Sequence, residues 1–161
     1  MNNVFEKLTK IPDLPKKEKN NQDLREVFER ERKEITELIK NLNQKIRIIT
    51  EIPELQVELY SYRQIIVEKR AQLYSTLSVI KKSLKNKRKK AYIETKTNND
   101  ISIKSAIDTN IFVEDYIREE SEKIDLLELQ INFMEESINT LDRVIFGIKN
   151  RISIEDFLVG N

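Results

Sequence analysis

The sequence predicts an all-α protein: an elongated helical hairpin with coiled-coil packing, plus a flanking N-terminal helix and a short C-terminal helix. Charged residues make up 35% of the chain and hydrophobic residues 39%, which is typical of long, surface-rich helices. Only two glycines and three prolines occur in 161 residues, too few for a turn-dense β fold. Apolar residues also recur at steps of three and four over long stretches. We therefore expect one helical domain over residues 23–161, preceded by a segment and linker over residues 1–22.

The first helix of the domain is predicted over residues 23–50. Asp23 is a favourable N-cap residue, and Pro53 cannot continue a helix without a kink. We expect a corner at Pro53, after which the chain packs back on itself. The apolar positions that predict this helix are Leu24, Phe28, Ile35, Leu38, Leu42, Ile46 and Ile49.

A second helix is predicted over residues 53–97, because proline is well suited to the first turn of a helix. Residues 95–100 contain no apolar side chain and several turn formers, so a loop should follow. The apolar face of this helix consists of Leu55, Leu59, Tyr62, Ile66, Leu73, Leu77, Ile80, Leu84 and Ala91.

The third long helix, over residues 110–150, has the most regular pattern. Asp108 or Thr109 is expected to cap its start. A sustained heptad seam of this kind specifies packing against another helix. Ser153 and Asp156 resemble a capping box, so a separate short helix is predicted over residues 154–159. The seam positions are Val113, Ile117, Glu120, Ile124, Leu127, Ile131, Met134, Ile138, Leu141, Ile145, Ile148 and Ile152.

Composition argues against an enzyme. The chain contains no His, Cys or Trp, so imidazole catalysis, thiol nucleophiles and zinc sites are excluded. Its two glycines cannot form a phosphate-binding loop. Adjacent carboxylates such as Glu119 and Glu120 point about 100° apart on a helix and indicate a solvated acidic face. We expect no cofactor, no metal site, no membrane span and a cytoplasmic location, which would be the host cell cytoplasm for a protein of phage origin.

Charge is distributed unevenly along the chain. Residues 1–99 contain 23 Lys and Arg against 14 Asp and Glu, whereas residues 100–161 contain 6 against 14. Such separated fields indicate either partners of opposite charge or one half that neutralises the other.

The strongest functional signal is a basic cluster in which seven of the ten residues from Lys81 to Lys90 are Lys or Arg. Cations and tyrosines fall on one arc of the predicted helix, with Tyr60 near its edge. Cations neutralise phosphates, and aromatic rings stack on unpaired bases without reading sequence. The candidate residues for binding single-stranded DNA are Arg63, Arg70, Tyr74, Lys81, Lys82, Lys85, Lys87, Arg88, Lys89 and Tyr92.

Two alternatives remain open at this stage. In an antiparallel hairpin the basic cluster would lie near Glu114, Asp115, Glu119 and Glu120 and could pair with them, or it could be a merely solvated face. The apolar tip around Phe157 could cover the chain's own hairpin or contact a second subunit.

Over residues 50–161 the pattern resembles phage recombination mediators of the UvsY type. A basic stretch followed by tyrosine, a polar loop, a long helix and a terminal helix occur in that order. Phe146-Gly147-Ile148-Lys149 and Phe157-Leu158-Val159-Gly160 are similar to the family's closing Phe-x-Ile-Lys and Phe-x-x-Gly. Val144 stands where the family has arginine, and the loop after Tyr92 lacks the family's glycines.

The resemblance implies a ring-like homo-oligomer that binds single-stranded DNA and helps to load a RecA-type recombinase by displacing a single-strand-binding protein. The family's DNA-contacting motif would correspond to Lys85, Lys87 and Arg88, with Tyr92 beyond. The resemblance and the apolar tip together give the oligomerisation residues as Phe146, Ile148, Ile154, Phe157 and Leu158. The alternative hypothesis is a structural coiled-coil protein, such as a phage virion or scaffold component, whose basic face binds an acidic protein.

Overall fold

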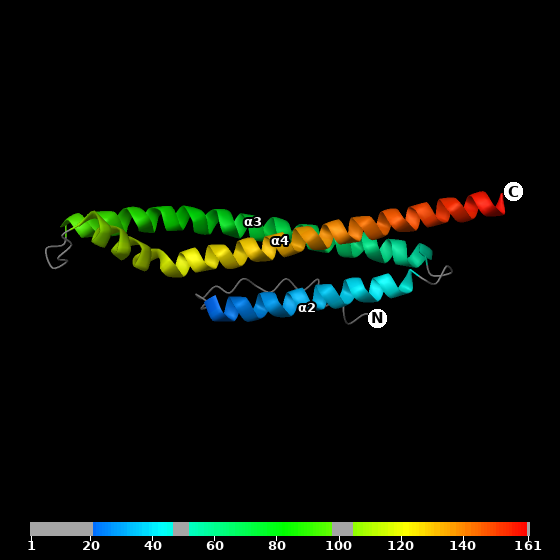
Figure 1. Cartoon of the computed structure of the whole chain (residues 1–161), viewed down its shortest axis with the longest axis horizontal. Coiled ribbons are helices and arrows are strands. Elements are labelled where there is room, and N and C mark those ends of the chain that lie inside the picture. Colours follow the sequence, from blue (N-terminus) through cyan, green and yellow to red (C-terminus); the bar gives the residue numbers. More distant parts are fainter. Residues whose placement is uncertain (1–20, 47–51, 98–104, 161) are drawn as a thin grey trace. The chain divides into compact units, whose positions relative to one another are not determined.

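The computed structural model describes residues 21–46, 52–97 and 105–160, which form three helices (Figure 1). Helix α2 spans Asn21–Lys45, α3 spans Ile52–Thr97 and α4 spans Ala106–Val159. These described stretches contain no strand, so the all-α prediction is confirmed. None of their helices is long and apolar enough to cross a membrane.

The helices divide into two compact units. Unit 1 contains α2, residues 52–71 of α3 and residues 131–159 of α4, whereas unit 2 contains residues 72–97 of α3 and residues 106–130 of α4. Each unit buries its own apolar seam.

Unit 1 is a three-helix packing in which α2 runs antiparallel to α3. Lys45, at the end of α2, pairs with Glu58 near the start of α3 at 3.0 Å, and Lys69 pairs with Glu31 at 2.5 Å. The predicted corner at Pro53 is therefore confirmed, with Pro53 in the first turn of α3. The α2 face that packs inward consists of Leu24, Phe28, Ile35, Leu38 and Leu42.

The α3 and α4 segments of unit 1 are also antiparallel. The Arg63 guanidinium pairs with Asp142 and that of Arg70 with Glu135. The seam predicted for residues 131–148 is buried in full: Ile131, Met134, Ile138, Leu141, Ile145 and Ile148. Arg151 additionally donates a hydrogen bond to the carbonyl oxygen of Ile46 at 2.9 Å, which satisfies an acceptor at the end of α2.

The start of α4 lies earlier than predicted. Ser105 is the cap: the Asp108 backbone N–H donates to Ser105 Oγ at 3.1 Å, and that hydroxyl donates to Asp108 Oδ2 at 2.8 Å. The Ser105 hydroxyl thus satisfies one of the free N–H groups in the first turn of α4. Asp108 therefore belongs to the first turn, and Thr109 donates its hydroxyl to the Ser105 carbonyl instead of capping.

The predicted end of the long helix at residue 150 was wrong, because α4 continues without a break to Val159. Ser153 does not act as a cap; its hydroxyl donates to the Lys149 carbonyl one turn back at 3.0 Å. Serine tolerates a helix interior in this way. Neither proline nor a positive-φ residue interrupts the described part of the helix, so residues 154–159 extend α4.

Candidate nucleic-acid interface

The basic cluster lies in unit 2, on the α3 segment of an antiparallel two-helix hairpin. Leu77 and Ala91 of α3 are buried, as are the Val113, Ile117 and Leu127 side chains of α4. This seam fixes which α3 positions face α4 and which face solvent. The angle between a cation and the seam therefore determines whether its side chain reaches α4 or faces solvent.

Lys81, Lys87 and Arg88 each pair with a carboxylate of α4. The Lys81 ammonium lies 2.6 Å from Glu128, and Arg88 Nη2 donates to Glu114 at 2.8 Å. Lys87 donates to Glu120. We call these three residues the paired cations. They flank the seam, as charged residues at the edges of a coiled coil do.

The Lys87 pair explains the one polar break in the predicted heptad seam of α4. Glu120 occupies a seam position but is half-buried and accepts the Lys87 hydrogen bond. That bond raises the pKa of Lys87, and the charge of Glu120 contributes in the same direction. The pair therefore keeps a charged residue at the seam without leaving it unpartnered.

Two further predicted DNA contacts, Arg63 and Arg70, are also ion-paired with carboxylates of α4, in unit 1. Arg63 makes a two-pronged contact with Asp142, with Nε to Oδ1 at 2.6 Å and Nη2 to Oδ2 at 3.0 Å. The Arg63 pKa is raised chiefly by this hydrogen bonding. Arg70 lies 3.8 Å from Glu135.

The remaining cations of the cluster point elsewhere. Lys82, Lys85 and Lys89 are exposed and form no ion pair with any residue of the described ranges. Their spacing places them within about 60° of one another, on the side of α3 away from the seam. Lys96 continues the same spacing and is also exposed. We call Lys82, Lys85, Lys89 and Lys96 the lysine row.

One member of the lysine row, Lys96, was missed by sequence reasoning. Lys96 lies seven residues beyond Lys89, so the heptad spacing alone could have found it. Lys90 is a further exposed cation without an ion pair among the described residues, but it lies about 100° around the helix from Lys89 and outside the lysine row.

Both predicted stacking tyrosines present a ring surface to solvent. Tyr74 is 48% exposed and Tyr92 is 40% exposed. They project to the same angle on α3, between the lysine row and the Lys81–Arg88 flank. The Tyr92 hydroxyl donates to Asn110 Oδ1 at 3.1 Å, so its ring is held against α4 by one edge while part of its face stays accessible.

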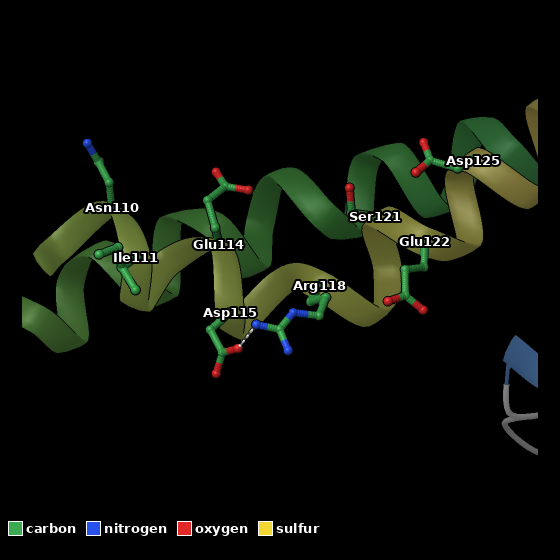
Figure 2. A pocket seen from close by; sticks show the side chains of 8 residues that line it. All are labelled: Asn110, Ile111, Glu114, Asp115, Arg118, Ser121, Glu122 and Asp125. Atoms are coloured by element: carbon green, nitrogen blue, oxygen red, sulfur yellow. Dashed lines mark ion pairs between the residues drawn. The ribbon is translucent and has the colours of Figure 1, made fainter. Parts of the chain in front are cut away.

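The outer side of α4 in unit 2 is acidic and forms a shallow depression (Figure 2). The carboxylates of Glu114 and Asp115 point to opposite edges of this surface, and Asp115 pairs with Arg118. The carboxylates diverge, which does not suit chelation. No cluster of potential metal ligands occurs among the described residues.

The predicted oligomerisation residues fall into two classes. Ile148 is only 1% exposed and belongs to the core of unit 1, because α4 continues its seam past that position. It is therefore not available for contact with another subunit in this packing. Phe146, Ile154 and Phe157 are each more than half exposed. The Leu158 side chain lies outside the described residues.

No protein-family model, curated protein or solved structure matches this chain. The similarity to UvsY-type mediators thus rests on the element order and the short motifs quoted above. Within its basic motif, Lys87 and Arg88 are ion-paired and Lys85 belongs to the lysine row.

Proposed function

We propose that this protein is a non-catalytic, single-stranded DNA-binding recombination mediator whose DNA contact is the lysine row together with Tyr74 and Tyr92. The observation that supports the proposal is the division of the basic cluster. The acidic residues of α4 engage the paired cations, while the lysine row remains without ion pairs among the described residues. Ion pairing within the chain accounts for the paired cations and leaves the four lysines of the lysine row to face solvent or a partner.

The geometry of the lysine row suits a flexible strand. From Lys82 to Lys96 the helix rises about 21 Å, which is long enough to follow several phosphates. Lysine acts as a point charge and does not demand a fixed fork geometry. Rings beside the row supply stacking surfaces for unpaired bases, which a duplex does not offer. Preference for single strands and tolerance of many sequences follow from this combination.

The mediator role is a second part of the proposal, and it is based on the resemblance to UvsY-type proteins. In that role the protein forms a homo-oligomer and helps a RecA-type recombinase to replace a single-strand-binding protein on DNA. Exposed Ile154 and Phe157, in the last turns of α4, are the apolar side chains we assign to contact between subunits. Light scattering on the intact protein should show an assembly larger than a monomer.

The second candidate is a structural coiled-coil protein whose basic face binds an acidic protein. The observation that favours it is the sequence of interhelical ion pairs that accompanies the seam in both units. Such pairs specify register and partner choice in coiled coils. Under this candidate the lysine row would bind acidic side chains and would not distinguish single strands from duplex.

The deciding experiment is a salt titration of binding to oligo-dT and to a duplex of equal phosphate number. The proposed function predicts tighter binding of the single strand, and a slope of log affinity against log salt of about −0.7 for each phosphate neutralised. Equal affinity for both DNA forms would leave the structural coiled-coil candidate. Heparin is no substitute here, since either candidate predicts that it binds.

A further inference from the structure

A second surface in unit 1 combines aromatic rings with cations. A hollow of about 320 Å³ lies between α3 and α4 and is lined by Tyr60, Arg63, Asp142, Ile145, Phe146 and Lys149. Ile145 is buried and forms its apolar floor, whereas Tyr60 is 44% exposed and Phe146 is 65% exposed. Two ring surfaces therefore border one small hollow, which is at the low end of the size range of ligand pockets.

Of the two cations that line this hollow, one is ion-paired and the other is not. Arg63 is engaged by both oxygens of Asp142. The Lys149 ammonium lies 5.9 Å from the centre of the Tyr60 ring and forms no ion pair with a described residue. Lys149 therefore supplies the hollow's uncompensated positive charge, held over an aromatic face.

We propose that this hollow binds one nucleobase of the single strand, with the base stacked on Phe146 beside Tyr60 and an adjoining phosphate on Lys149. The proposal rests on the proposed function and adds a binding point outside the lysine row. Stacking explains why a large phenyl ring is exposed next to another ring, and the charge of Lys149 complements a phosphate. The other occupant to consider is a second copy of the chain, but lysine is depleted from the cores of protein interfaces.

The absence of tryptophan from the chain provides a direct test. Phe146→Trp would introduce a single tryptophan emitter that preserves a stacking surface at an exposed position. Oligo-dT should quench this emission, and an abasic strand of equal length should not, because it carries the phosphates without the bases. Leu129→Trp, at an exposed position of α4 in unit 2, is the matched emitter and should respond to neither strand.

Affinity measurements provide the second readout. Phe146→Ala should weaken oligo-dT binding about tenfold with an unchanged salt slope, and Lys149→Gln should lower the slope by about 0.7. Light scattering should show the same assembly for Phe146→Ala as for the intact protein. Both substitutions are at exposed positions, so the fold should be retained, which circular dichroism would verify.

Different failures have different meanings. If oligo-dT binds without changing the tryptophan emission at position 146, the hollow is not a base site. The proposal for the lysine row would be unaffected. Dissociation of the assembly by Phe146→Ala also overturns the hollow as a base site, in favour of a contact between subunits. An intact protein that does not bind oligo-dT at all overturns the proposed function and the hollow with it.

Discussion

The lysine row and the paired cations lie on one helix, interleave in sequence and differ in what they contact. Lys82 follows Lys81, and Lys89 follows Arg88, yet only the earlier residue of each couple reaches a carboxylate of α4. One position along a helix turns a side chain by about 100°. Density of charge along the sequence therefore does not show which cations are ion-paired within the described residues; the angle of each cation to the apolar seam does.

The largest expected effect comes from two charge-matched triple variants. Lys82, Lys85 and Lys89 are replaced by Ala in one, and the paired cations by Ala in the other. Losing three phosphate contacts should weaken oligo-dT binding about 100-fold at about 0.1 M salt and reduce the slope by about 2. Fluorescence anisotropy of a labelled strand measures both quantities.

The paired-cation variant is the control for net charge. It removes the same number of positive charges from the same helix, and the carboxylates that lose their partners act on DNA only through screened fields. Its affinity should stay within about threefold of the intact protein. Equal losses in the two variants would show that total charge, and not the lysine row, governs binding.

The next effect separates stacking from charge at Tyr92. Tyr92→Ala should cost about 1–3 kcal/mol of binding free energy with the salt slope unchanged. Tyr92→Phe retains the ring and loses only the hydroxyl that donates to Asn110. It should bind nearly as tightly as the intact protein. Equal weakening by both substitutions would assign the contribution of Tyr92 to its contact with α4 and remove it from the stacking surface.

Sequence alone predicted the helices well and the interface only in part. The α4 seam emerged correctly because seven-residue spacing is a local property, and even its polar member, Glu120, proved to be a paired seam residue. The end at residue 150 was misplaced because Ser153 can bond back within a helix as readily as it can cap one. Which carboxylate of α4 each cation meets depends on the register between two segments far apart in sequence, and that register is not a local property.

A smaller effect tests the structural side of the comparison. Lys81→Glu alone places like charges together at Glu128 and should lower the free energy of unfolding by up to about 1 kcal/mol. Adding Glu128→Lys restores an ion pair with reversed polarity and should recover that loss. Chemical denaturation measures both. A swap that fails to recover stability would mean that the Lys81–Glu128 pair does not contribute to the hairpin.

The last prediction is that pH has no effect on oligo-dT affinity in the neutral range. With no His and no Cys in the chain, no side chain has an ordinary pKa between about 5 and 8. Hydrogen bonding to Glu120 raises the pKa of Lys87, so the stabilisation from this pair is complete below lysine's ordinary pKa of about 10.4 and is lost only as pH rises through the higher folded value. The Lys87–Glu120 pair should therefore persist across the neutral pH range. Oligo-dT affinity at fixed salt should be constant from about pH 6 to about pH 8. A titration within that range would point to a group outside the paired cations whose protonation controls access to the lysine row.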